Sequence, residues 1–189
     1  MPVVWRCGTM GEQGCRWGVG MPYEPVRHQR RSIRLVGYDY AQGGAYFVTI
    51  CVQGRACLLG EIVEGEVRLS AAGEAVARCW EDLPDHFPTV ELDACAIMPN
   101  HVHGIIFLTE SRDAGAACAP LSHVVGAFKS FSARRINALR GVTGSCWQRG
   151  YYEHIIRNER SLARLREYVA QNPARWELDR LHPDAPEAW

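Results

Sequence analysis

The chain has 189 residues, as many basic as acidic side chains, and a hydrophobic content of 47%, which suits a packed core in one domain. Zero formal net charge argues against a uniformly basic nucleic-acid binder. No apolar run reaches the roughly 20 residues that a membrane-spanning helix needs, and the first twenty residues lack the apolar stretch of a secretory signal. We therefore expect a cytoplasmic protein. The eight cysteines form no C-x-x-C pair, so we expect buried thiols rather than a zinc site.

Gly-rich residues 1–20 show no hydrophobic period and are expected to be disordered, and Met21 is a second candidate for the natural start. The first regular element is a strand over 45–53, which is rich in aromatic and β-branched residues. Residues 60–70 predict a hairpin that turns near Glu64–Gly65. Apolar residues then recur at helical spacing from Ser70, a candidate N-cap, to about Asp85.

Two strands are predicted at 90–98 and 101–109, and Pro99–Asn100 between them is a turn signal, so the pair forms an antiparallel hairpin. After a polar loop, residues 121–139 have helical periodicity and 151–157 read as a strand. Asn158 then caps a helix that Pro173 ends. This order contains β-α-β-β-α-β, which predicts an α+β, ferredoxin-like fold with an antiparallel sheet and an additional C-terminal helix.

Two histidines stand one residue apart in the strand "HVHGIIFLT". Because alternate residues of a strand share a face, His101 and His103 point the same way and Val102 points the other way. Two imidazoles on one face can share a metal ion, whereas burying them as structural residues is costly without hydrogen-bond partners. The spacing therefore favours a metal site over a structural pair.

A tyrosine and an asparagine are four residues apart in the last predicted helix. Tyr168 and Asn172 therefore lie on one helix face, one turn apart. Asn172 offers a neutral oxygen ligand, and Tyr168 offers a phenol, which needs activation to act as a nucleophile. Taken alone, an aromatic residue on an amphipathic helix is an ordinary packing residue.

The segments "MPNHVHGII" and "WQRGYYEHIIRNERSLARLREYVAQNP" together resemble the REP-associated tyrosine transposases. These are single-tyrosine nucleases with a histidine-hydrophobe-histidine (HUH) motif. The segment "RRSIRLVGYDYAQGGAYFVTICVQGR" is similar to the N-terminal strand region of that family. The resemblance divides the chain into an N-terminal extension (1–29), an HUH nuclease domain (30–176) carrying the tyrosine helix, and a tail (177–189).

The resemblance implies a metal-dependent nuclease and transposase that cuts and rejoins single-stranded DNA near hairpin repeats. Tyr168 would attack a phosphate, form a 5′-phosphotyrosine link and release a 3′-hydroxyl. His101, His103 and Asn172 would bind Mg²⁺ or Mn²⁺. The chain would act in the cytoplasm at the nucleoid, as a monomer or homodimer.

Charge is unevenly distributed along the chain. Residues 58–93 carry nine acids and two bases, whereas 127–168 carry nine bases and three acids, with a further cluster at 27–34. A basic side of this kind can contact phosphates even at zero net charge, although solvated helix faces explain the charges as well. The candidate DNA-binding residues are Lys129, Arg134, Arg135, Arg149, Arg157, Arg30, Arg31 and Arg34.

Two other functions fit the same residues. A relative that binds hairpin DNA without cutting would keep the fold and the basic surface. A metal hydrolase that does not act on DNA would use the H-x-H pair, although no further Asp or His ligand constellation is apparent in the sequence. The DNA target and the choice between self-mobilisation and a host role stay open.

Overall fold

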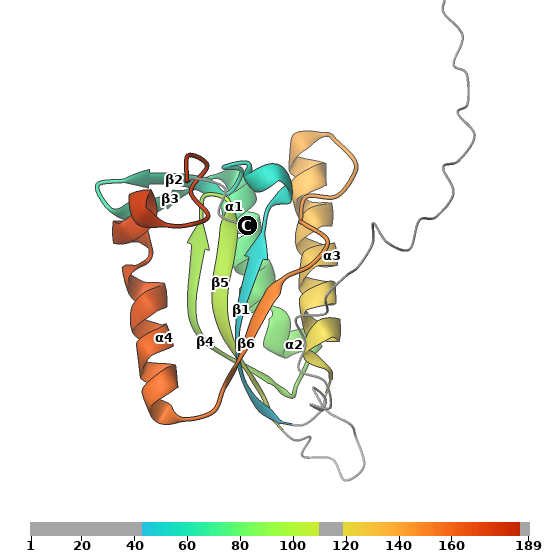
Figure 1. Cartoon of the computed structure of the whole chain (residues 1–189). Coiled ribbons are helices and arrows are strands. Elements are labelled where there is room, and N and C mark those ends of the chain that lie inside the picture. The colour runs from blue at the N-terminus through green and yellow to red at the C-terminus, as the bar shows by residue number, and fades with distance from the viewer. Residues whose placement is uncertain (1–42, 110–118, 186–189) are drawn as a thin grey trace, which may run out of the picture. The chain divides into compact units, whose positions relative to one another are not determined.

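A four-stranded antiparallel sheet in the order β4-β5-β1-β6 organises the fold (Figure 1). The computed structural model describes residues 43–109 and 119–185, all of which belong to the unit formed by residues 33–189. The central strand β1 pairs with β5 on one side and β6 on the other, and β4 pairs with β5. The strands are β1 (Gly44–Cys51), β4 (Val90–Met98), β5 (His101–Leu108) and β6 (Tyr152–Ile156).

Helix α1 (Ala71–Glu81) follows β1, and α3 (Leu121–Arg140) joins β5 to β6, so the core runs β-α-β-β-α-β. Every neighbouring strand pair is antiparallel, as the split β-α-β arrangement requires. The α+β prediction is confirmed. The hairpin of β2 (Gly60–Val63) and β3 (Glu66–Leu69) is inserted before α1. At its turn, the φ values of Glu64 and Gly65 are 54° and 80°, the positive pair that a type I′ turn needs.

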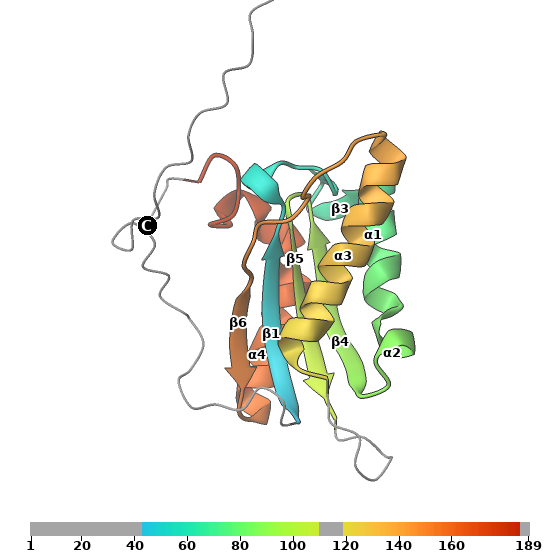
Figure 2. The ribbon, with the colours of Figure 1, turned by 90° about the vertical axis from the view of Figure 1, so that its right-hand side faces the viewer.

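The two faces of the sheet are covered by different helices (Figure 2). Helices α1 and α3 lie on one face, where Val48, Ile50 and Val102 join the larger apolar core. Helix α4 (Glu159–Gln171) lies on the other face and packs through Leu162 and Val169 against Phe47 and Ile105. Alternation along β1 and β5 therefore separates a structural face from the face that carries both histidines.

The helix caps were predicted correctly, but one helix is shorter than expected. Ser70 Oγ accepts a hydrogen bond from the Gly73 amide, and Asn158 Oδ1 accepts one from Ser161. The helix predicted to continue to Asp85 instead ends at Glu81 and is followed by the short α2 (Leu83–His86). Pro84 explains the break, because its ring has no N–H to donate and clashes with the preceding turn.

Two 3-10 helices complete the regular structure of the described residues, η2 (Gln53–Arg55) after β1 and η3 (Pro173–Leu178) after α4. No helix in 43–109 or 119–185 is long and apolar enough to cross a membrane. Several predictions fall outside the described residues. These are the N-terminal extension and its start, Arg30, Arg31 and Arg34, most of the loop before α3, and the last four residues of the tail.

Gly104 on β5 is required by the packing of α1. A Cβ at this position would collide with the indole ring of Trp80, which is itself buried. We expect Gly104→Ala to destabilise the protein by about 1–3 kcal/mol, the usual cost of overpacking a core. Denaturant unfolding measures this. Gly126→Ala is the control, because a Cβ added there would have no atom within 4 Å and alanine favours an exposed helix by about 0.5–1 kcal/mol. Equal stabilities for the two variants would contradict the prediction.

An ion pair fastens α4 to the edge of the sheet. Arg166 Nε of α4 donates to both carboxylate oxygens of Asp93 on β4, at 3.2 and 2.8 Å, and Arg166 Nη2 lies 2.6 Å from Asp93 Oδ2. This hydrogen bonding lowers the pKa of Asp93. A carboxyl group whose pKa falls on folding stabilises the protein above its unfolded pKa, near 3.9, and loses that contribution as the pH drops through the folded value.

We therefore expect the stability of the wild type to fall more steeply with acidification below about pH 5 than that of Asp93→Asn, because only the wild type has this carboxylate to protonate. Thermal unfolding across pH 3–7 measures the difference. Glu91→Gln removes an exposed carboxylate from the same strand and should keep the wild-type profile. Parallel profiles for the wild type and Asp93→Asn would show that the pair contributes nothing.

Candidate active site

The two histidines of β5 lie side by side on the face covered by α4. His101 and His103 are buried, with ring centroids 4.4 Å apart, whereas Val102 packs into the opposite core. The predicted shared face is confirmed. Burial lowers the pKa of each imidazole to about 3, and the neighbouring His101 contributes to the shift at His103. Both rings are therefore neutral near pH 7, the state in which an imidazole can bind a metal.

Asn100, in the turn before β5, fixes the tautomer of His101. Its Nδ2 group donates to the carbonyl oxygens of Arg55 and Leu181, at 3.2 and 2.7 Å. Its Oδ1 atom must then be the one facing His101 Nδ1, at 2.8 Å. An amide oxygen can only accept, so the ring proton sits on Nδ1 and the Nε2 lone pair is available. A metal-binding histidine is typically oriented in this way.

His103 bridges the sheet and the tyrosine helix. Its Nδ1 atom lies 2.9 Å from the hydroxyl of Thr49 on β1, and its Nε2 atom lies 3.3 Å from the hydroxyl of Tyr168 on α4. With the proton on Nδ1, the ring donates to Thr49 and presents Nε2 to the phenol. The fold thus brings together a histidine and a tyrosine that are 65 residues apart in the sequence.

The Tyr168 ring lies beside the His103 ring, at a centroid distance of 5.2 Å, and packs edge-on against Phe47, at 6.0 Å. The side chain is 44% exposed, so its hydroxyl is at the boundary between the buried histidines and solvent. Burial and the negative charge of Asp179 raise the pKa of the phenol. The hydroxyl is therefore protonated at neutral pH and needs a nearby positive charge to become a good nucleophile.

Asn172, one turn after Tyr168, has a buried side chain. The amide lies beside the His101 ring and the Tyr168 hydroxyl, and Nδ2 donates to Asp179 Oδ2 at 3.0 Å. Within the described residues, neither Asn172 Oδ1 nor His101 Nε2 has a hydrogen-bond partner. Two acceptor atoms left unpaired in a buried site are the atoms that a cation would use.

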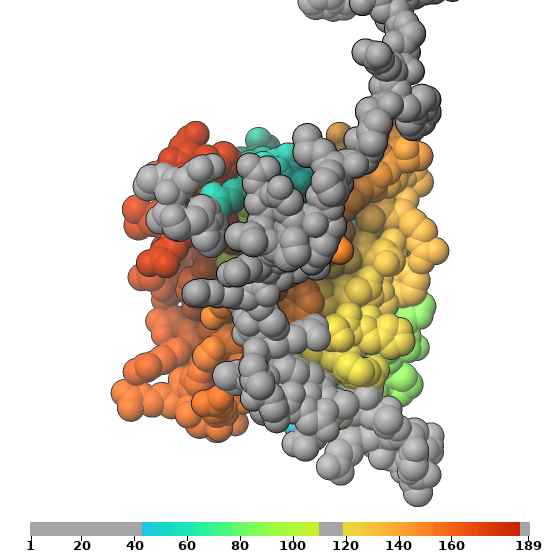
Figure 3. All heavy atoms as spheres, turned by 45° about the vertical axis from the view of Figure 1, so that its right-hand side comes forward, coloured from blue at the N-terminus to red at the C-terminus, as the bar shows by residue number. Residues whose placement is uncertain are grey.

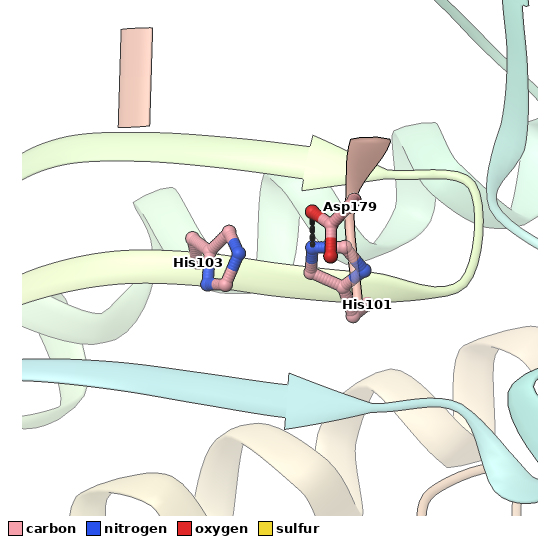
Figure 4. A group of neighbouring side chains, drawn as sticks. All are labelled: His101, His103 and Asp179. Atoms are coloured by element: carbon pink, nitrogen blue, oxygen red, sulfur yellow. Dashed lines mark ion pairs between the residues drawn. The ribbon is translucent and has the colours of Figure 1, made fainter. Parts of the chain in front are cut away.

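Asp179 adds a carboxylate that sequence reasoning missed. Potential ligand atoms of His101, His103 and Asp179 all lie within 4.8 Å of one another. Figure 4 shows the carboxylate directed at the His101 ring, with 3.8 Å between Oδ2 and Nε2. Since His101 is neutral, this contact is not a charged pair. The donor set of imidazole nitrogens and amide and carboxylate oxygens fits a divalent cation.

A cavity of about 2000 Å³ opens beside this group of residues. Its wall includes His103 and Tyr168, and also Tyr152 and His154 of β6, which project from the same face of the sheet. Three basic side chains also line it, and none of them was among the predicted DNA-binding residues: Arg55, Arg175 and Arg180. Three acidic side chains line the cavity as well: Glu177, Asp179 and Asp184.

The predicted basic residues are dispersed. Arg134 stacks on Phe131 and Arg135 pairs with Asp82, both through α3, on the face of the sheet opposite the histidines. Figure 3 shows the surfaces of α3 (yellow) and of α4 with the following turn (orange to red) on opposite sides of the view. The structure therefore does not bring Arg134 and Arg135 to the candidate site.

The other three predicted basic residues within the described part of the chain occupy different positions. They are Lys129, Arg149 and Arg157. The Lys129 ammonium group donates to the carbonyl oxygens of residues 148, 149 and 150, at 2.6, 3.2 and 3.1 Å. It thereby holds the loop that contains Arg149 and whose other two residues line the cavity. Arg157 follows the end of β6 that pairs with the start of β1, away from His101. Contacts of these three residues with DNA stay predictions.

Comparison with known proteins agrees with this arrangement. The family model described as "Transposase IS200 like" matches residues 75–172, just over half of the chain. A Haemophilus influenzae (strain Rd) protein of uncharacterised function is 40% identical over 183 residues, which cover 86% of this chain and 98% of that protein. A second protein of that strain, provisionally named REP-associated tyrosine transposase, is 27% identical over 168 residues, covering 80% of this chain and 90% of its own.

A solved structure, that of a REP-associated tyrosine transposase bound to a REP hairpin, shares the fold. It has a TM-score of 0.56 and 21% identity, and the match covers 78% of this chain and 77% of that chain. The chain belongs to the IS200-like transposase family. Within it, the resemblance to REP-associated tyrosine transposases is confirmed by the named relative and the shared fold.

Proposed function

We propose that this chain is a metal-dependent transposase that cleaves and rejoins single-stranded DNA near hairpin repeats, with Tyr168 as the nucleophile. The observation that carries the proposal is the approach of the Tyr168 hydroxyl to His103, at 3.3 Å, beside two buried acceptor atoms that lack partners among the described residues. A tyrosine that only fills space in the core would not be expected to place its hydroxyl beside a histidine nitrogen and two unpaired acceptor atoms.

In the proposed step, the tyrosine oxygen replaces the 3′ oxygen in one phosphodiester bond of the DNA. The phenol oxygen of Tyr168 forms a bond to the phosphorus of the scissile phosphate and loses its proton, while the bond from phosphorus to the 3′ oxygen breaks and that oxygen gains a proton. The products are a 5′-phosphotyrosine and a free 3′-hydroxyl. Attack by a 3′-hydroxyl on the phosphotyrosine reverses the step and joins the strands.

His101, His103 and Asn172 are proposed to hold Mg²⁺ or Mn²⁺. Bound there, the ion would polarise the phosphoryl oxygens and offset negative charge near the nucleophile. Asn100 and Thr49 orient the imidazoles, because each bonds to the ring nitrogen that does not face Asn172 or Tyr168. Phe47 supports both the tyrosine ring and the His103 ring, at centroid distances of 6.0 and 5.3 Å.

The proposed substrate is a single strand next to a DNA hairpin. Support comes from the structural relative, which is bound to a REP hairpin, and from the cavity with Arg55, Arg175 and Arg180 in its wall. Arginines bind phosphates well because the guanidinium group can donate two parallel hydrogen bonds. Tyr152 is 53% exposed in the same cavity and could stack on a base.

The chain is proposed to act as a monomer or a homodimer. The test of the whole proposal uses the purified full chain, Mg²⁺ or Mn²⁺, and labelled single-stranded oligonucleotides from the DNA flanking its gene. A covalent protein–DNA band on a denaturing gel, lost with a chelator, is expected. Hairpin binding without such a band would instead favour a DNA-binding protein that does not cut.

A further inference from the structure

Asp179 follows the tyrosine helix in a segment of the chain that is fixed to the histidine site. Its side chain is 5% exposed. Oδ1 accepts from the Leu181 amide at 2.7 Å, and Oδ2 accepts from Asn172 Nδ2 at 3.0 Å. The Leu181 carbonyl in turn accepts from Asn100, the residue that orients His101. One asparagine therefore positions both a histidine and the turn that carries this carboxylate.

Among the described residues, this buried carboxylate forms no ion pair with a lysine or an arginine. The one basic group paired with it there is His101, whose Nε2 atom lies 3.8 Å from Oδ2, too far for a hydrogen bond. A buried anion is costly unless a cation or a full set of hydrogen-bond donors balances it. Two donors are present, and the side facing His101 and His103 has none. A divalent cation at this position would supply the missing charge.

We propose that Asp179 is itself a metal ligand, which makes the site one of two imidazoles, the Asn172 amide oxygen and a carboxylate. The inference rests on the proposed metal-dependent function and extends the ligand set that Tyr168 would work beside. Two imidazoles with a carboxylate are a donor set for first-row transition ions. The site is therefore expected to bind Mn²⁺ more tightly than Mg²⁺, which prefers oxygen ligands alone.

A purely structural role for Asp179 has a different signature. Its bond to the Leu181 amide closes a turn of the kind that aspartate and asparagine form equally well. Asp179→Asn keeps an oxygen for that turn, but it replaces the oxygen that accepts from Asn172 with an N–H donor and removes the negative charge. A structural role predicts a lower free energy of unfolding with little change in metal affinity, whereas a ligand role predicts a large loss of metal affinity.

The test is titration of the full chain with Mn²⁺, followed by calorimetry and by the electron paramagnetic resonance signal of free Mn²⁺, without DNA. We expect Asp179→Asn to weaken Mn²⁺ binding at least about 10-fold. The matched control is Asp184→Asn, which removes the same charge from the same segment at a side chain that is 92% exposed. The Mn²⁺ affinity of this control variant should stay within about twofold of the wild-type value, because solvent and salt screen an exposed charge.

The outcomes separate this inference from the proposed function. If Asp179→Asn binds Mn²⁺ as tightly as the wild type does, the inference is overturned and the other three ligands stay in place. Equal weakening in Asp179→Asn and Asp184→Asn also overturns it, because the effect would then be one of overall charge. Absence of Mn²⁺ binding by the wild type would contradict the metal-dependent function itself. Unfolding curves confirm that both variants are folded.

Discussion

Tyr168→Phe is expected to abolish the covalent protein–DNA product. The substitution removes the attacking oxygen and leaves the ring packed against Phe47. Loss of the nucleophile from an enzyme that forms a covalent intermediate typically costs three orders of magnitude or more, so we expect a loss of at least about 1000-fold. Folding should be nearly unaffected, because the hydrogen bond between the hydroxyl and His103 is long, at 3.3 Å.

The matched control for this variant is Tyr152→Phe. Tyr152 lies in the same cavity and is also exposed, but its hydroxyl has no place in the proposed attack. Its product yield should stay within a few-fold of the wild type. Both variants should bind hairpin DNA normally in a gel-shift assay. A covalent band that survives in Tyr168→Phe and disappears in Tyr152→Phe would reassign the nucleophile to β6.

His101→Ala and His103→Ala are expected to abolish both metal binding and cleavage. Each substitution removes one of the two imidazoles. We expect metal affinity to fall about 100-fold or more, and the cleavage rate to fall by a similar factor. Loss of a residue that only supports a metal ligand typically costs about 10–100-fold, and loss of the ligand itself should cost more. A second readout is thermal stability. Mn²⁺ at 100 times the wild-type Kd should stabilise the wild type by about 2.7 kcal/mol, and at the same concentration both variants should be stabilised by about 0.4 kcal/mol or less.

His154→Ala is the control for the histidine variants. His154 lies on the same face of the sheet and lines the same cavity, but it is outside the group of residues proposed to bind the ion. It should keep the stabilisation by Mn²⁺. Loss of this stabilisation in His154→Ala, with retention in His101→Ala, would move the metal site from β5 to β6.

The sequence was sufficient for the features that depend on local periodicity. A period of two placed His101 and His103 on one face, and a period of 3.6 placed Tyr168 and Asn172 one turn apart. The caps at Ser70 and Asn158 followed from side chains that can accept a hydrogen bond from a free helix amide. In each case the interacting groups are fewer than five residues apart, so local geometry decides the outcome.

Asp179 could not be found in this way. It follows Asn172 by seven residues, after the kinked 3-10 helix η3. Its position depends on its hydrogen bonds with Leu181 and Asn172, and on the hydrogen bond from Asn100 to the Leu181 carbonyl. The only signal in the sequence was an aspartate shortly after the tyrosine helix, and acidic residues in tails are common. Long-range hydrogen bonds of this kind have no pattern along the chain.

The spatial distribution of the basic residues could not be predicted for a related reason. Charges counted along 127–168 combine α3, β6 and α4, but α3 and α4 cover opposite faces of the sheet. Arg134 and Arg135 consequently lie away from the histidines. Arg175 and Arg180, which line the cavity, stand in a segment with mixed charge. Which helix covers which face is set by tertiary packing, and a count of charges contains no information about it.

The position of α4 on the sheet leads to a genetic test of how many copies make one site. Tyr168 meets His103 of the same polypeptide. If a single copy makes a complete site, a copy lacking the tyrosine and a copy lacking the histidines should not restore activity when they are expressed together. Restored activity would mean that two copies exchange the tyrosine helix.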